Sequence, residues 1–230
     1  SAAGMLKAEL STLGSSLYRM ALGCRVPAGG ALAVDRLQFS QAVTEAVERH
    51  PLIQVVRGEV TDLDTLASHS IALVLATGPL TSDGLSPAIE QLCGTQALAF
   101  YDAAAPIVMA ESLDGEKVFR QSRYEDDGIG DYLNAPFSQG EYEAFIDALL
   151  EARRVVAKEF ETTELFQACQ PIEEIARKGR DAPRFGPMKP VGLIDPRTGR
   201  RPWAALQLRA EDAAHQSYNL VGFQTNLAFP

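Results

Sequence analysis

The chain has 230 residues, of which 46% are hydrophobic and 22% are charged, a composition typical of a globular protein and not of a disordered or fibrous one. Three widely spaced cysteines argue against a disulfide framework and for a reducing compartment. The net charge of −9 argues against wholesale coating of nucleic acid, although it does not exclude local basic patches. Because the apolar stretches are too short to span a membrane and no signal peptide opens the chain, we expect a cytoplasmic protein without a membrane partner.

The first segment is predicted to form a helix followed by a turn. Leucine spacing predicts a helix from Ser1 through Leu17, weakened by Gly14. Residues 26–30, Val-Pro-Ala-Gly-Gly, predict a turn, and residues 31–34 predict a short strand.

A helix and two strands are predicted next. Asp35 and Gln38 have the spacing of a capping box, which predicts the start of a helix that Pro51 closes. The apolar residues 52–56 and 71–76 predict strands, the second of them buried on both faces. Since strands that alternate with helices favour a parallel sheet covered by helices, we expect an α/β fold.

Charge is distributed unevenly over the second half of the chain. Residues 111–151 are rich in acids, which we interpret as a solvated face. Within them, Ser138 and Glu141 predict a capping box and an amphipathic helix. Residues 177–209 instead carry nine basic side chains against two acidic ones. At their end, the alternation in residues 203–209 predicts a half-buried strand.

Two chemical signatures are incomplete. Residues 128–133, Gly-Ile-Gly-Asp-Tyr-Leu, begin like a dinucleotide-binding fingerprint but have leucine at the third glycine position and follow three acids instead of a strand. His50, His69 and His215 do not lie at metal-ligand spacing with acids or cysteines, so no metal site is predicted.

The segment Ala76-Thr77-Gly78 is a candidate ligand contact. Small residues at the carboxyl end of a parallel strand let the backbone approach a ligand. A tight turn with no ligand is the alternative interpretation.

Cys169 is a candidate reactive thiol. Pro171 suits the first position of a helix, which places Cys169 just outside a helix N-terminus. Unpaired amides there favour the thiolate, and Arg177 or Arg180 would add positive charge if they folded back. Glu173 and Glu174 oppose this effect, and a packed structural thiol is the alternative.

The basic stretch is a candidate site for a polyanionic substrate, because phosphate contacts come chiefly from arginine and lysine. Scattered surface charge is the alternative. Phe185 and Trp203 lie among these charges, where they are available to stack on a base or a pterin or to pack in a core. The candidate substrate-binding residues are Arg177, Lys178, Arg180, Arg184, Lys189 and Arg197.

Long ordered segments of the chain closely resemble the folate-dependent tRNA uracil-5-methyltransferases of the TrmFO family. The matching segments are residues 26–36, 76–82, 100–108, 184–193, 195–200 and 218–225. The resemblance implies a flavoenzyme that transfers a methylene group from 5,10-methylenetetrahydrofolate to carbon 5 of a T-loop uridine in tRNA. FAD, reduced by NAD(P)H, then converts the methylene to a methyl group. In such chemistry a thiolate adds to carbon 6 of uracil and makes carbon 5 nucleophilic.

The resemblance also assigns roles to residues. Residues 169–174, Cys-Gln-Pro-Ile-Glu-Glu, match the motif of the family's catalytic cysteine, so Cys169 is expected to be the nucleophile or an acid/base partner. FAD contacts are expected from Val60, which matches an adenine-contacting position, and from Ala76, Thr77 and Gly78. The basic residues from Arg177 to Arg201 are expected to bind tRNA phosphates or the folate glutamate tail. The family's glycine fingerprint and second catalytic cysteine have no counterpart in this sequence.

We therefore expect the central portion of a longer protein, in which a partial Rossmann-like FAD-binding domain is interrupted by a smaller α+β insertion domain. The expected segments are residues 1–82 and 165–230 for the FAD-binding domain and 83–164 for the insertion. By itself the chain is expected to be inactive and to bind little or no FAD. Two alternatives remain open, the related flavoprotein GidA (MnmG), which modifies wobble uridines, and a non-catalytic tRNA-binding module. The sequence does not indicate the oligomeric state.

Overall fold

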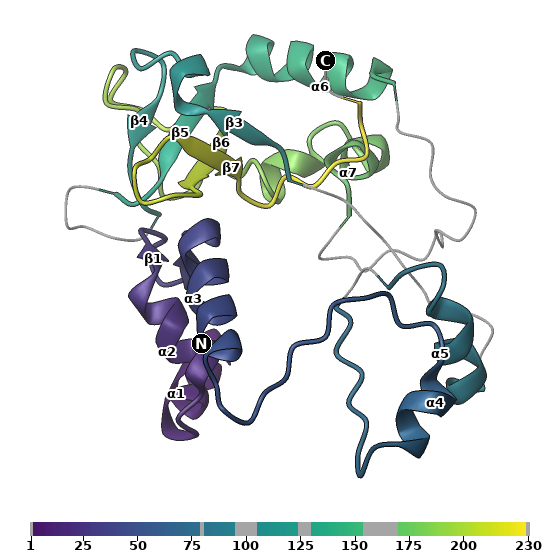
Figure 1. Cartoon of the computed structure of the whole chain (residues 1–230). Coiled ribbons are helices and arrows are strands. Elements are labelled where there is room, and N and C mark those ends of the chain that lie inside the picture. Colours follow the sequence, from purple (N-terminus) through teal and green to yellow (C-terminus); the bar gives the residue numbers. More distant parts are fainter. Residues whose placement is uncertain (1, 79–80, 95–104, 124–129, 154–169, 229–230) are drawn as a thin grey trace. The chain divides into compact units, whose positions relative to one another are not determined.

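The structure is a computed structural model that describes residues 2–78, 81–94, 105–123, 130–153 and 170–228 (Figure 1). The chain divides into two compact units. The first comprises residues 1–53, 103–155 and 166–230, and the second comprises residues 54–102 and 156–165. No helix in the described ranges has the length and apolar content needed to cross a membrane.

Gly14 divides the predicted N-terminal helix into two. Helix α1 spans Ala2–Thr12 and α2 spans Ser16–Gly23. Gly14 has a φ of 67°, a left-handed conformation that glycine adopts without steric cost, and Ser15 then caps α2 by accepting from the Tyr18 N–H. The low helix propensity of Gly14 therefore marks the break between α1 and α2.

Asp35 links the next helix to a distant loop. Strands β1 (Arg25–Val26) and β2 (Ala33–Val34) form a short hairpin that leads into helix α3 (Arg36–Glu48). The buried Asp35 carboxylate accepts from the Gln38 N–H at 3.0 Å, which confirms the predicted cap, and from the Ala213 N–H at 3.2 Å. In a full capping box the Gln38 side chain would accept from the Asp35 backbone N–H. Here the Gln38 amide instead donates to the Asp35 carboxylate at 3.0 Å.

The first unit is built on a five-stranded sheet in the order β3-β7-β6-β5-β4 (Figure 1). Every described pairing in it is antiparallel, and residues 31–34, 52–56 and 71–76, from which a parallel sheet was predicted, do not belong to it. The sheet joins strands from both sides of the boundary expected at residue 164. Its strands are β3 (Ile107–Met109), β4 (Phe119–Arg120), β5 (Leu133–Phe137), β6 (Ala204–Ala210) and β7 (Ser217–Leu220).

Residues 52–56 and 71–76 do not form the predicted strands. They are extended segments of the second unit and its border, and their apolar side chains are exposed, by 89% at Leu52 and 82% at Val74. A strand requires a neighbour for its backbone hydrogen bonds, and no described segment pairs with either of them. The described helices of the second unit are α4 (Leu63–Ser68) and α5 (Ser86–Cys93).

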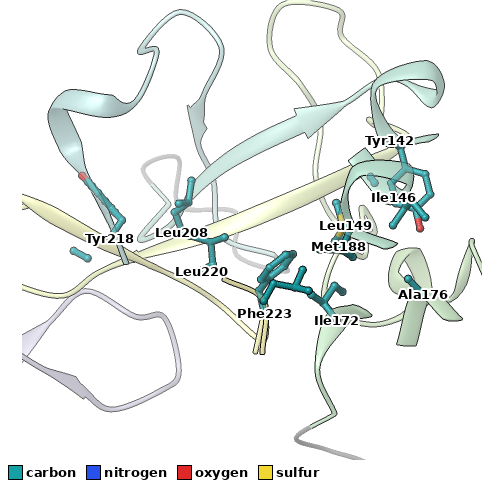
Figure 2. Close-up of a cluster of buried hydrophobic side chains, with 13 residues drawn as sticks. Tyr142, Ile146, Leu149, Ile172, Ala176, Met188, Leu208, Tyr218, Leu220 and Phe223 are labelled. Carbon is teal, nitrogen blue, oxygen red and sulfur yellow. The ribbon is translucent and has the colours of Figure 1, made fainter. Parts of the chain in front are cut away.

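The main core lies between the sheet and two helices, α6 (Gln139–Glu151) and α7 (Ile172–Lys178) (Figure 2). The capping box of Ser138 and Glu141 at the start of α6 is confirmed, as is the helix's apolar face. Figure 2 shows Phe223 between Leu220 and Ile172. Two short 3₁₀ helices, Ala110–Ser112 and Ala182–Phe185, complete the described elements.

Both faces of β6 are covered, which corrects the prediction of a half-buried strand. Ala204 and Leu208 belong to the main core, whereas Ala205 packs with Phe119 and Leu193 in a separate cluster. The alternation in the sequence separates the two faces, but it does not show that a polar face is also buried. Buried Gln207 lies on this second face and donates to Asn134 at 3.5 Å.

Gly130 allows two chain segments to cross closely. A Cβ atom at this position would lie 2.0 Å from the Ser122 backbone nitrogen. Asp131 accepts a hydrogen bond from the Gly29 N–H at 2.5 Å, and the Tyr132 hydroxyl donates to the Ala28 carbonyl at 2.7 Å. Gly130 therefore serves the packing of the 26–30 turn, and it precedes a strand instead of opening a phosphate-binding helix.

Replacing Gly130 with alanine is expected to destabilise the first unit by at least about 2 kcal/mol, because the new methyl group would overlap backbone atoms that cannot move aside. Chemical unfolding of the 230-residue chain measures the effect. Gly140→Ala is the matched control, since a Cβ there meets no atom within 4 Å and alanine favours helix α6. Equal stability of the two variants would contradict the role of Gly130.

Acidification is expected to remove the stabilisation from Asp35. Hydrogen bonds from the backbone of Gln38, then of Ala213, lower the pKa of its carboxyl below the ordinary 3.8. Its contribution is therefore present above pH 3.8 and is lost as the pH falls through the lowered native pKa. Asp35→Asn, which still caps α3 but does not titrate, should weaken the fall in melting temperature between about pH 5 and pH 2. The exposed Asp83→Asn should leave that fall unchanged, and an identical profile for both variants would refute the prediction.

Candidate functional site

A tight hairpin in the basic stretch fixes one arginine. Gly199, with a φ of 65°, turns the chain so that the Asp195 N–H donates to the Arg200 carbonyl at 2.9 Å. The buried Asp195 carboxylate accepts from the Arg197 guanidinium at 3.0 and 2.8 Å. These side-chain hydrogen bonds lower the pKa of Asp195 below its ordinary value. Arg197 also donates to the Glu116 carbonyl, so its guanidinium is engaged within the protein.

Two adjoining clefts share a wall made of Arg201, Pro202 and Trp203, and we call them the Trp203 clefts. The first, of about 510 Å³, is lined by Lys117, Pro136, Phe137, Ser138, Glu141, Asp195, Arg197, Thr198, Arg200 and the shared wall. The second, of about 400 Å³, is lined by Arg184, Phe185, Lys189, Pro190, Val191 and the shared wall. The segments 184–193 and 195–200, two of those that carry the resemblance, thus line adjoining clefts.

Arg184 holds the shared wall in place. Its guanidinium carbon lies 3.6 Å from the centre of the Trp203 ring, and its Nε–H donates to the Trp203 carbonyl at 3.0 Å. A guanidinium over an indole is attracted by the electron-rich ring face. Phe185, the next residue, projects into solvent with 78% of its surface exposed. The second cleft therefore contains one fixed aromatic ring, Trp203, and one exposed ring, Phe185.

Most of the basic residues predicted to bind substrate have partners within the protein. Arg177 pairs with Glu174, Lys178 donates to Gln170, and Arg180 lies 2.6 Å from Asp147. The partner of Arg177 lies in the first turn of α7, whereas that of Arg180 lies in α6. Arg184 and Arg197 are engaged as described above. Lys189 lines the second Trp203 cleft, and its carbonyl accepts a hydrogen bond from Arg123 at 2.5 Å.

Arg200 and Arg201 differ from these residues. Both are exposed, and within the described ranges neither side chain has an ion pair or a hydrogen bond. Glu141 in the same cleft accepts hydrogen bonds from Ser138, which lower the pKa of its carboxyl below its ordinary value. The two carboxylates of the first cleft therefore already have partners. The sequence analysis included Arg200 and Arg201 in the basic stretch expected to bind a polyanion but not among the six candidate residues, because composition does not show which side chains are paired.

Cys169 lies outside the described residues, but the segment that follows it is well anchored. Glu173 is 1% exposed and accepts from the Thr225 hydroxyl at 3.0 Å and from the Asn226 N–H at 2.8 Å. The Ile172 N–H donates to the Gln224 carbonyl at 2.8 Å. Two segments of the resemblance, 169–174 and 218–225, are therefore joined at the start of α7.

The four expected FAD contacts lie in the second unit, where they are exposed. Gly78 has a φ of 74° and no atom within 4 Å of a Cβ position, so its backbone is accessible. Val60 lies between Glu59 and Thr61, and both of these neighbours pack against Gly84. Ala76 and Thr77 directly precede Gly78. In the described ranges, no three histidine, cysteine, aspartate or glutamate side chains gather as metal ligands would.

Comparison with known proteins gives one consistent result. A family model described as glucose inhibited division protein A matches residues 1–230. A relative from Geobacter sulfurreducens, named methylenetetrahydrofolate–tRNA-(uracil-5-)-methyltransferase TrmFO, is 55% identical over 100% of this chain and 52% of its own length. Relatives of the same name from Synechococcus sp. and Koribacter versatilis are 55% and 53% identical over 98% and 100% of the chain. The chain spans about half the length of the curated relatives it matches.

Replacing Arg184 with lysine is expected to loosen the shared wall. Lysine loses the planar stacking on Trp203 and the hydrogen bond to its carbonyl, at a cost of about 1–3 kcal/mol in unfolding free energy. Trp203 is the only tryptophan of the chain, so its emission should shift to longer wavelength and become easier to quench with acrylamide. Arg177→Lys, at an exposed ion pair, should change neither property. Unchanged Trp203 emission in Arg184→Lys would contradict the described contact.

Proposed function

Because the chain belongs to the glucose inhibited division protein A family, we propose that the complete protein is a methylenetetrahydrofolate- and FAD-dependent tRNA (uracil-5-)-methyltransferase. The observation that carries this proposal is identity of 53–55% to relatives of that name over nearly the whole chain. The substrates are a T-loop uridine of tRNA and 5,10-methylenetetrahydrofolate. The product is 5-methyluridine, and the protein acts in the cytoplasm.

The residues expected to contact FAD fit a bound flavin nucleotide. The backbone of Ala76, Thr77 and Gly78 is exposed, and no side chain blocks the approach to Gly78. Val60 would contact the adenine. Bound FAD, reduced by NAD(P)H, would supply the two electrons that convert a methylene group to a methyl group. The chain's part in that reduction is to hold the cofactor by exposed backbone at residues 76–78.

Cys169 supplies the chemistry at the uracil ring. Its thiolate adds to carbon 6, which makes carbon 5 nucleophilic, and carbon 5 forms a bond to the methylene carbon. A proton is then removed from carbon 5, and the bond between the methylene carbon and the folate nitrogen breaks with release of tetrahydrofolate. The thiolate leaves carbon 6 when a hydride is added to the methylene carbon. An acid/base role for Cys169 is the alternative assignment. The buried Glu173, held by Thr225 and Asn226, fixes the segment that follows this cysteine. The basic stretch binds the polyanionic tRNA or the glutamate tail of the folate.

The exposed apolar residues 52–56 and 71–76 support the finer fold assignment. In the complete protein, we expect these segments to be strands of a Rossmann-like FAD-binding domain that pair with strands from outside the present chain. Residues 83–164 are then an α+β insertion in the sequence between residues 1–82 and 165–230, and its strands share the five-stranded sheet with β6 and β7 of the second segment. Pairing would bury side chains such as Leu52 and Val74, which the described residues leave exposed.

Cys169→Ala in the complete protein is expected to abolish methyl transfer to carbon 5 while FAD remains bound. Mass analysis of the nucleosides from a treated tRNA transcript measures the product, and flavin absorbance measures the cofactor. Cys93→Ala, at an exposed free cysteine, is the matched control and should retain activity.

Undiminished 5-methyluridine from Cys169→Ala would refute the role of the thiol. A wobble-uridine product from the wild type would instead assign the protein to the related GidA-type reaction. A complete protein that binds tRNA but forms neither product would favour a non-catalytic tRNA-binding module.

A further inference from the structure

We infer that the two Trp203 clefts form one RNA-binding surface, in which Arg200 and Arg201 contact phosphates and Phe185 stacks on an unpaired base. The inference rests on the proposed function, because it names the place where the tRNA would be held. It narrows the expectation that the basic residues from Arg177 to Arg201 bind tRNA or folate to two arginines outside the six candidate residues, and it adds Phe185.

The charge of the first cleft favours an anion. Its lining includes four cationic side chains and two carboxylates. Asp195 is paired with Arg197 and Lys117 with Asp114, whereas Glu141 accepts hydrogen bonds from Ser138 and keeps its negative charge. Arg200 and Arg201 have no side-chain partner in the part of the chain that the structure describes, so cations still outnumber anions in the cleft. Two neighbouring unpaired guanidinium groups match successive phosphates of a nucleic-acid strand.

The aromatic side chains favour RNA over a simple anion. Phe185 is a large apolar ring that is 78% exposed beside these cations. An exposed ring next to basic side chains is the arrangement on which unpaired bases stack in single strands and loops. The neighbouring Arg184 is fixed by Trp203 and holds the backbone on which Phe185 is presented.

The geometry also assigns separate roles to the two clefts. Arg200 lines the first, Phe185 lines the second, and Arg201 belongs to the wall that both share. A strand that crossed this wall would place phosphates at the arginines and a base at Phe185. A folate glutamate tail presents carboxylates to the same arginines, so it is the competing source of negative charge.

The test measures the binding of a fluorescent tRNA transcript to the complete protein at several salt concentrations. The double variant R200A/R201A should weaken binding about tenfold and reduce the slope of log affinity against log salt by about 2, because two phosphate contacts are lost. Phe185→Leu should weaken binding about tenfold with an unchanged slope, because only stacking is lost. The control variant R25A/R36A removes two exposed arginines without described side-chain partners from β1 and α3 and should change affinity less than about twofold.

Circular dichroism and flavin content verify that each variant is folded. Equal effects of R200A/R201A and R25A/R36A would overturn the inference. So would an R200A/R201A protein that binds tRNA normally but has lost affinity for a folate polyglutamate, because the cleft would then hold the cosubstrate. If tRNA binding depends on Arg200 and Arg201 but wild-type protein forms no methylated uridine, the proposed function fails and the RNA-binding surface stands. If R200A/R201A methylates tRNA and binds it normally, the proposed function stands and the RNA-binding surface is refuted.

Discussion

Backbone hydrogen bonding between neighbouring strands decides which parts of this chain become sheet. Strand β6 pairs along one edge with β5 and along the other with β7, so that Leu208 lies opposite both Leu133 and Leu220. Such a central strand leaves neither edge unsatisfied, and both of its faces are covered by side chains. Residues 71–76 have an equally apolar sequence but no described partner, and they remain extended and exposed. Apolar character alone is therefore insufficient for a strand.

The same constraint explains how far the fold could be predicted. The caps at Asp35 and Ser138 depend on residues three positions away, so the sequence indicates them directly. The interruption at Gly14 is likewise a local property of glycine. Strand partners are separated by many residues, as Leu133 and Leu208 are, and no local pattern specifies such a pairing. The starts of α3 and α6 were thus accessible from the sequence, whereas helices α4 and α5 and the antiparallel order of the sheet were not predicted.

The candidate site shows a corresponding limit for charged residues. Composition predicts a basic surface, but Arg197 and Arg200 are indistinguishable by composition. In the structure, the turn at Gly199 leaves Arg197 on the Asp195 carboxylate, whereas the Arg200 side chain has no partner among the described residues. An arginine already held by a carboxylate must break those bonds before it can bind a phosphate, whereas an unpaired arginine gives up only water. The availability of a cation is therefore set by the hairpin and not by the number of charges in the stretch.

The sheet connects the two groups of residues that the proposed reaction requires. Trp203 directly precedes β6, so the start of this strand positions the shared wall of the Trp203 clefts. The Ala205 N–H also donates to the Met188 carbonyl at 3.1 Å, which joins the same strand to the segment 184–191 of the second cleft. After β7, the chain reaches Thr225, whose hydroxyl donates to the buried Glu173 of the cysteine motif. A change in the pairing of β6 with β7 would therefore displace the RNA-binding surface relative to the segment that follows Cys169. A shift of one residue would bring Gln207 into the main core in place of Leu208. The hydrophobic core therefore resists such a change, and packing far from the substrate maintains the geometry of the site.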